Sequence, residues 1–263
     1  MHEAVYHMAQ HRRRLIALWG ITAGQRVLEI GCGQGYCTTE LARTVGPGGF
    51  VHGVDMGEAD YGAPQTLGQA RAALLRSDLG PRLRIDLETD FLLPGFKPEY
   101  DRYDIVVFAH CAFYMDAPEV LMALLRKART LAPRLALAEW DIRPKSTGQL
   151  AHASALQIQA LAESYSVRSE SNIRTLFLPD DLLSQAEAAG WRNVTCHSLA
   201  AADQPDALWE CDVVVREYAE LIKALPIAAK TRRVLRTQID LMAEQARSYG
   251  MEPLDVTVLT AGE

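Results

Sequence analysis

Along most of the chain, short apolar runs alternate with longer amphipathic stretches. Val27, Leu28 and Ile30 indicate a first buried strand, and similar runs predict further strands at 50–56, 82–89, 103–109, 134–140, 192–199 and 254–260. Helical spacing predicts one helix that begins near Cys37 and others at 2–19, 65–77, 118–129, 147–166, 179–189, 207–225 and 228–249. Such alternation is typical of an α/β domain built on a mostly parallel sheet.

The run at 103–109 is apolar throughout, which is typical of a central parallel strand buried on both faces. The residues that follow it, from His110 to Tyr114, should lie at the carboxyl end of that strand. Open α/β sheets bind their ligands at this edge. His110 is therefore the best placed titratable group in the sequence.

Three glycines follow the first strand at alternate positions, Gly31, Gly33 and Gly35. Because they lack a Cβ atom, a ligand can approach the bare main chain, and the helix behind them offers unpaired N–H groups. A dinucleotide-binding turn, G-x-G-x-x-G, requires a third glycine where this chain has Tyr36, and a P-loop requires a lysine that does not follow here. The turn is thus expected to hold a small ligand of another kind.

Glu29 followed by G-x-G-x-G resembles motif I of the class I S-adenosylmethionine-dependent methyltransferases. The resemblance implies a doubly wound, seven-stranded, mostly parallel sheet and S-adenosylmethionine as the cofactor. By position, Gly31, Gly33 and Gly35 would lie against the amino-acid end of the cofactor, with Glu29 on the side of its ammonium group.

Further positions match the same family. Asp55 stands at the tip of the second strand, about 20 residues past the glycines, where both this family and dinucleotide enzymes bind ribose hydroxyls. Asp90 and Phe91 resemble the pair that meets adenine, although Asp90 could instead cap a helix or turn. The other cofactor contacts that the resemblance implies follow the second and fourth strands: Met56, Ala109 and His110.

Methyl transfer requires an acceptor aligned with the cofactor and, for a hydroxyl or protonated amine, a general base. His110 is the first candidate for the base, and Tyr114 and Glu139 are poorer alternatives. His110 could instead contact the cofactor through its main chain. The expected reaction is methylation of a small metabolite or natural product at oxygen, nitrogen or carbon. Two alternatives stay open: a Rossmann-type NAD-linked oxidoreductase, and a non-catalytic binding or assembly module.

Length and composition favour one methyltransferase domain over 1–263. The regular alternation lapses in two places, so helical insertions are expected at about 142–178 and 203–252. We interpret them as a lid over the substrate, with an oligomer interface or an extension of the core as alternatives of nearly equal weight. The sequence does not predict the oligomeric state.

Charge and cysteine content limit the binding partners and the cellular compartment that we expect. A net charge of −6 and a pI near 5.7 argue against nucleic-acid binding. Five scattered cysteines without a C-x-x-C pair predict neither a disulfide framework nor a zinc site, which favours a cytoplasmic protein. No apolar run is long enough to cross a membrane. His7 and His11 share a helix face, but no third ligand accompanies them, so no metal is expected.

Overall fold

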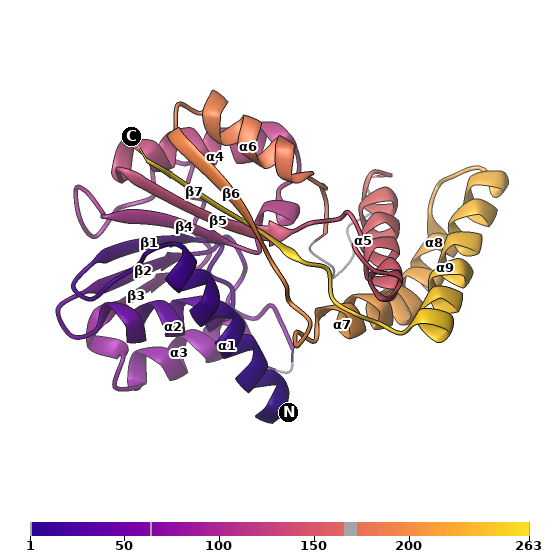
Figure 1. Ribbon diagram of the computed structural model, residues 1–263, viewed down its shortest axis with the longest axis horizontal. Helices are drawn as coiled ribbons and strands as arrows, with labels where there is room; N and C mark the ends of the chain where they lie inside the picture. The colour runs from indigo at the N-terminus through magenta and orange to yellow at the C-terminus, as the bar shows by residue number, and fades with distance from the viewer. Residues whose placement is uncertain (1, 64, 166–172, 263) are drawn as a thin grey trace.

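The computed structural model describes residues 2–63, 65–165 and 173–262 (Figure 1). A single sheet of seven strands runs through the molecule in the order β3-β2-β1-β4-β5-β7-β6, and β7 runs antiparallel to both of its neighbours. The strands are β1 Arg26–Ile30, β2 Phe50–Val54, β3 Leu83–Asp86, β4 Ile105–Ala109, β5 Arg134–Trp140, β6 Arg192–Leu199 and β7 Val256–Gly262. The predicted seven-stranded, mostly parallel sheet is confirmed.

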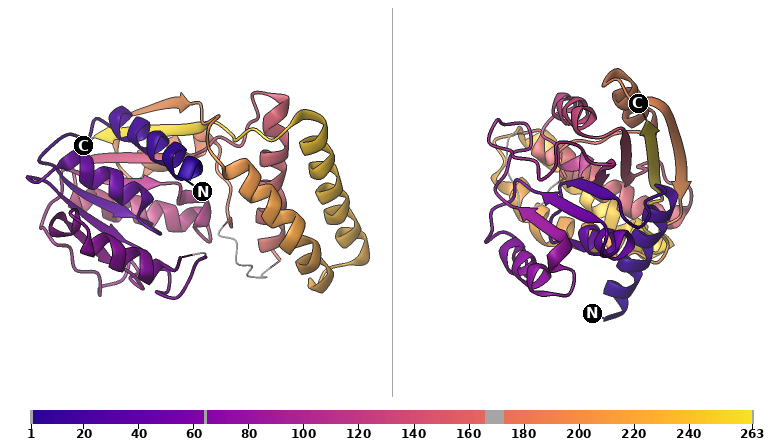
Figure 2. Two further views of the ribbon diagram at one scale, coloured as in Figure 1. Left: turned by 90° about the horizontal axis from the view of Figure 1, so that it is seen from below. Right: turned by 90° about the vertical axis from the view of Figure 1, so that its left-hand side faces the viewer.

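Helices cover both faces of the sheet. On one face are α1 (His2–Leu18), α2 (Tyr36–Val45) and α3 (Leu67–Arg76), and on the other are α4 (Pro118–Leu131) and α6 (Pro179–Ala188), as Figures 1 and 2 show. Helix α1 packs against α2, and α4 packs against α6. This two-sided cover explains why β4, the middle strand of the sheet, is apolar along its whole length.

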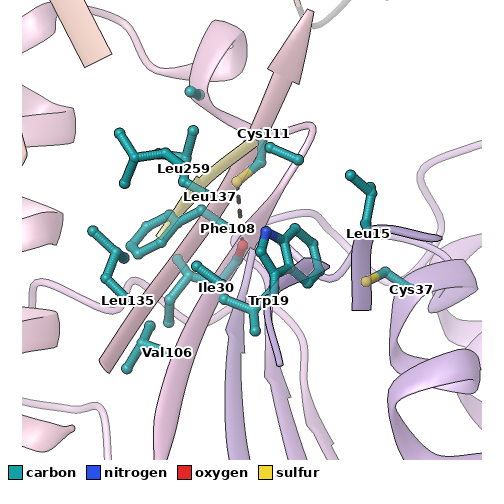
Figure 3. Packing of buried hydrophobic residues seen from close by; sticks show 14 of the residues in the cluster. Leu15, Trp19, Ile30, Cys37, Val106, Phe108, Cys111, Leu135, Leu137 and Leu259 are labelled. Carbon is teal, nitrogen blue, oxygen red and sulfur yellow. Dashed lines mark hydrogen bonds between the residues drawn. The ribbon is translucent and has the colours of Figure 1, made fainter. Parts of the chain in front are cut away.

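The centre of the core lies where β1 and β4 pair, with Leu28 opposite Val106. Both residues are fully buried. Figure 3 shows how Trp19 from the end of α1 packs beside this pair of strands, together with side chains of β4, β5 and β7. The Cys111 thiol donates a hydrogen bond to the Ile30 carbonyl oxygen at 3.2 Å, which ties the loop after β4 to the end of β1. The two loops that begin the site are therefore fixed to each other.

Four further helices form a separate layer, which we call the helical unit: α5 (Leu150–Glu163), α7 (Asp206–Val213), α8 (Ala219–Ala224) and α9 (Ala229–Tyr249). They lie beyond the end of the sheet where β5 ends (Figures 1 and 2). Residues such as Tyr218, Ile222 and Met242 bury their side chains in a second apolar cluster that belongs to this unit alone. The two expected insertions thus meet each other in space, since α5 comes from the first and α7 to α9 from the second.

Most boundaries differ from the predicted ones by one or two residues, and four elements differ in further ways. The third strand ends at Asp86 instead of 89, and the last strand is Val256–Gly262 instead of 254–260. The helix predicted at 147–166 is a 3₁₀ turn, Thr147–Gln149, followed by α5. The helix predicted at 207–225 contains a π-helical turn, Val214–Tyr218, between α7 and α8. Residues 166–172 of the first insertion lie outside the described residues.

The described residues also contain three short 3₁₀ turns: Gly80–Arg82, Ala112–Tyr114 and Thr147–Gln149. None of the helices in the described ranges combines the length and apolar character that crossing a bilayer requires.

Candidate active site

The glycine turn between β1 and α2 is built from left-handed backbone. Gly31, Gly33 and Gly35 have φ angles of +75°, +52° and +77°. A Cβ atom at Gly31 would lie 2.6 Å from the Cβ of Cys111, and one at Gly35 would lie 2.4 Å from a methyl of Leu74, so packing alone requires both glycines. A Cβ atom at Gly33 would meet nothing within 4 Å. The open space at Gly33 is therefore the part of the turn that a ligand can occupy.

Asp55, directly after β2, holds this turn in place. Its Oδ2 accepts a hydrogen bond from the Gly33 N–H at 2.7 Å, and its Oδ1 accepts one from the Gly57 N–H at 2.7 Å. A carboxylate oxygen has two lone pairs, so each oxygen can accept one bond more. Met56 follows with 68% of its surface exposed. The sequence argument placed Asp55 correctly beside the glycines, and its contact with ribose stays a prediction.

Glu29 is 1% exposed near the end of β1, and its Oε2 accepts a hydrogen bond from the Thr38 hydroxyl at 2.6 Å. Burial raises the pKa of Glu29 to about 7, against the lowering effect of hydrogen bonds from Thr38 and Cys37. Burial disfavours the charged form, and a cation beside the carboxyl would favour it. Glu29 is thus a buried acid whose charge depends on what lies next to it.

His110, at the end of β4, has a φ angle of +53°, which is strained for a residue with a side chain. Its Nε2 lies 3.4 Å from Nε2 of His11 in α1, and its Nδ1 lies 3.7 Å from Oε1 of Glu139. The Trp140 ring lies beside it, with 5.5 Å between ring centroids. Nδ1 of His110 is buried and has no hydrogen-bond partner. A strained, incompletely bonded histidine at the ligand-binding edge is a candidate for a reacting group.

Two further histidines surround His110 and remain neutral near pH 7. Burial, followed by the charge of His110, lowers the pKa of His11 to about 2. The same causes lower the pKa of His152 to about 3, and its Nδ1 accepts a hydrogen bond from the Leu254 N–H at 3.0 Å. His152 also contacts Trp140 edge-on at 5.3 Å. The neighbours of His110 therefore add no positive charge of their own.

A cavity of about 370 Å³, the first cavity, lies against the glycine turn. It falls within the range of roughly 300–1,000 Å³ that ligand pockets occupy. Of the residues predicted for the site, the structure brings these together in its wall: Glu29, Gly31, Gly33, Ala109, His110 and Tyr114.

A second cavity of about 660 Å³ adjoins the first, between the sheet and the helical unit. Residues of the helical unit, such as Trp209 and Glu210, line both cavities. So does Tyr114, which lies in the 3₁₀ turn after β4. Tyr114 keeps 37% of its surface accessible. Burial of its hydroxyl, followed by the charge of nearby carboxylates, raises the pKa of that group well above its ordinary value.

Several predicted residues lie outside the walls of both cavities. Phe91 is buried in the core, where its ring packs edge-on against Phe96 at 4.9 Å. The Asp90 side chain accepts a hydrogen bond from the Leu92 N–H at 2.7 Å, which is the capping role that the sequence left open. The others outside the walls are Gly35, Asp55, Met56 and Glu139. The adenine contact of Asp90 and Phe91 stays a prediction.

Glu139 does not line either cavity, because it lies behind His110. It is 1% exposed, and its carboxylate accepts hydrogen bonds from the Phe113 N–H at 3.2 Å and the Trp140 N–H at 3.0 Å. Its Oε1 lies 3.7 Å from Nδ1 of His110. The role of Glu139 as an alternative base stays a prediction.

The sequence missed several residues that line the cavities. Arg12 and His11 come from α1, and Trp209 and Glu210 come from α7. No local motif marks them, since they reach the site only because α1 and the helical unit pack over the carboxyl edge of the sheet. Arg12 brings a positive charge to the first cavity, whose wall also contains the acids Glu29, Asp206 and Glu210.

The cysteines near the site are not nucleophiles. Cys32, Cys37 and Cys111 are buried, and burial raises the pKa of each thiol well above its ordinary value. Thiols in such surroundings stay protonated and inert. Within the described ranges, no group of three or more His, Cys, Asp or Glu side chains is arranged to hold a metal ion.

The sheet order, the antiparallel seventh strand and the glycine turn under an open cavity define the class I methyltransferase fold. Residues 1–196 match a family model described as a methyltransferase domain, which is most of the chain. The chain belongs to this family. The predicted family and fold class are therefore confirmed.

Curated relatives are methyltransferases as well. The methyltransferase phomM' of Diaporthe leptostromiformis is 29% identical over 239 residues, covering 75% of this chain and 61% of that protein. The aklanonic acid methyltransferase DauC of Streptomyces sp. (strain C5) is 33% identical over 121 residues, covering 45% of this chain and 49% of that protein. The chain thus spans about half to three fifths of the length of these relatives.

Solved structures share the fold. A cyclopropane-fatty-acyl-phospholipid synthase-like protein from Lactobacillus casei superposes with a TM-score of 0.88 at 29% identity, over 99% of this chain and 92% of that chain. The phosphoethanolamine N-methyltransferase 2 of Haemonchus contortus, solved with S-adenosyl-L-methionine, superposes with a TM-score of 0.54 at 14% identity, over 97% of this chain and 52% of that chain. The second likeness supports the fold alone.

Proposed function

We propose that this chain binds S-adenosylmethionine in the first cavity and transfers its methyl group to a small molecule held in the second. One observation carries the proposal: a cavity against the glycine turn, with His110 in its wall, adjoins at Tyr114 a larger cavity under the helical unit. A two-substrate reaction needs two adjoining sites with a reacting group at their junction.

The residues of the first cavity fit this cofactor. Gly33 leaves open the space that a Cβ would fill, and Asp55 beside it keeps free lone pairs for hydroxyl donors. The amino-acid end of the cofactor carries an ammonium and a carboxylate. Glu29 and Arg12 supply one charge for each, and the buried Glu29 gains its charge fully when a cation lies next to it.

The open alternatives are less well supported. A dinucleotide oxidoreductase usually has an all-parallel sheet and a third turn glycine, whereas here β7 is antiparallel and Tyr36 already begins α2. A non-catalytic module would not need a strained histidine in the wall of the first cavity. Both alternatives predict weak or absent binding of S-adenosylmethionine.

When bound, S-adenosylmethionine supplies a methyl group on a positively charged sulfur, which makes the methyl electrophilic without a further catalyst. The chain's task is then to align an acceptor and to remove a proton. We assign Nδ1–H of His110 to the Glu139 side, 3.7 Å away, so that Nε2 accepts the proton of the acceptor. The Glu139 carboxylate stabilises the imidazolium that results.

We further propose that the helical unit serves as the lid that covers the acceptor. Support comes from the cavity walls, since Trp209 and Glu210 of α7 face the same space as Tyr114 of the sheet domain. Excluding water from this space would protect the reacting groups and strengthen their electrostatic interactions.

The test uses the whole chain. Isothermal titration with S-adenosylmethionine and S-adenosylhomocysteine should show binding at one site, and NADH should not bind. Incubation of S-adenosylmethionine carrying a labelled methyl group with a panel of small hydroxyl and amine compounds should then yield labelled product. Folded protein that binds neither S-adenosyl compound, or that prefers NADH, would overturn the proposal.

A further inference from the structure

The second cavity has an unusual combination of side chains. Three carboxylates line it: Asp60 from the loop after β2, Glu210 from α7 and Glu217 from the π-helical turn. Three aromatic rings share the walls: Tyr61, Tyr114 and Trp209. Among the described residues of its lining, no side chain is basic. The described lining of this cavity is therefore acidic and aromatic.

The three carboxylates have no basic partner among the described residues, since no ion pair joins Asp60, Glu210 or Glu217 to a basic side chain there. Glu210 accepts a hydrogen bond from the Gln159 side chain of α5 at 2.7 Å, which fixes its position without supplying charge. Burial, followed by the charge of Asp206, raises the pKa of Glu210 to about 7. An acid in this state is stabilised in its charged form when a cation approaches.

The aromatic rings keep accessible surface on the cavity. Tyr61, Tyr114 and Trp209 are 40%, 37% and 46% exposed, although each of them lines the cavity. The face of an aromatic ring attracts cations, and tryptophan does so most strongly. Rings combined with carboxylates are the arrangement by which proteins recognise ammonium and quaternary ammonium groups.

The second cavity is continuous with the first. Tyr61, Tyr114, Trp209 and Glu210 line both, and His110 lies in the wall of the first. A molecule whose charged end lies among the carboxylates can therefore extend its other end toward His110.

We infer that the second cavity binds the methyl acceptor through a positively charged amine, protonated or quaternary, held by Glu210, Glu217 and the ring of Trp209. This inference rests on the proposed function and names the substrate class of that site. An acceptor whose recognised group is a phosphate or a carboxylate would face three carboxylates here and is disfavoured.

The test compares three probes of similar size: benzyltrimethylammonium as cation, benzyl alcohol as neutral molecule and benzenesulfonate as anion. Each is titrated calorimetrically into the whole chain, with and without saturating S-adenosylhomocysteine. The cation should bind at least about tenfold more tightly than the other two. Glu210→Gln and Glu217→Gln should each weaken it about tenfold, as a charge-assisted contact worth about 1.4 kcal/mol would require.

Glu220→Gln is the matched control, because Glu220 lies on α8, is 72% exposed, pairs with Lys223 and lines neither cavity. It removes the same charge and should leave cation binding unchanged. Thermal unfolding of each variant checks that the helical unit stays folded. Equal binding of cation and sulfonate, or equal loss in the control and the two cavity variants, would overturn the inference. Failure to bind S-adenosylhomocysteine would overturn the proposed function instead, and the titrations without it still test the cavity.

Discussion

Substituting alanine for Gly33 tests the cofactor site with little effect on the fold. A Cβ at this position meets no atom within 4 Å, so its cost to folding comes only from the backbone, where φ is +52°. Left-handed backbone costs a residue with a side chain about 1–2 kcal/mol. For a domain of this size, that loss corresponds to a fall of the midpoint of thermal unfolding by about 2–8 °C. The variant should therefore fold at room temperature.

Cofactor binding should respond much more strongly. The new methyl group would occupy the space in which we place the amino-acid end of S-adenosylmethionine, so we expect binding of S-adenosylhomocysteine to weaken at least tenfold, or by more than about 1.4 kcal/mol. Gly24→Ala is the matched control: Gly24 has a φ of +85°, its Cβ also meets nothing within 4 Å, and it lies in a turn before β1. The control should lose stability and keep its affinity.

Isothermal titration of the two variants, beside thermal unfolding followed by circular dichroism, gives both quantities. The reasoning fails if Gly33→Ala binds S-adenosylhomocysteine as tightly as the unaltered chain, because the space in front of this glycine would then not hold the ligand. It fails equally if Gly24→Ala weakens binding to the same extent, since strain alone would then explain the loss.

Three further predictions concern charges and the base. His110→Ala should lower kcat at least about 100-fold, in line with general-base contributions, and change the dissociation constant of S-adenosylhomocysteine less than threefold by calorimetry; unchanged turnover would remove the base role. Because the pKa of Glu29 is about 7 in the free chain, its charged form is scarce at pH 6, so affinity for the ammonium-bearing cofactor should rise about eightfold from pH 6 to 7.5. Glu29→Gln should flatten this rise, and a parallel rise in the variant would contradict the assignment. Arg12→Ala should weaken S-adenosylhomocysteine about tenfold or more, whereas Arg14→Ala, an exposed arginine on the same helix, should not; equal effects would point to general electrostatics.

Local patterns were enough to predict the sheet and its first crossover. The strands at 134–140 and 192–199 have the predicted bounds. The first is a buried, mostly apolar run, which a sequence pattern indicates directly. The glycine turn was predictable for a similar reason, since each of its features follows from residues within ten positions of one another. Asp55 could be placed because parallel strands bring their carboxyl ends to one edge.

Contacts between distant segments could not be predicted. His11 meets His110 across 99 positions, and nothing in the helical pattern of 2–19 indicates which edge of the sheet that helix approaches. The helices of the second insertion were predictable as helices. Their packing against α5 was not, because it depends on a cluster of apolar residues shared by the two insertions. This packing places Trp209 and Glu210 of α7 at the cavities. The π-helical turn at Val214–Tyr218 likewise has no local signal.

The predicted adenine contact depends on tertiary packing that a motif does not specify. The Phe91 side chain is buried against Phe96 and lies near the ammonium of Lys127, and its contact with adenine stays a prediction. A hydrophobic residue after a strand is equally suited to the core and to a binding site, and only the tertiary packing decides between them.

A crystal structure of the whole chain grown with S-adenosylhomocysteine tests the central claim most directly. We predict the nucleoside in the first cavity, its amino-acid end over Gly33 between Glu29 and Arg12, and its sulfur directed toward His110 and the second cavity. Density for the ligand elsewhere, or a sulfur that faces away from the second cavity, would contradict the account.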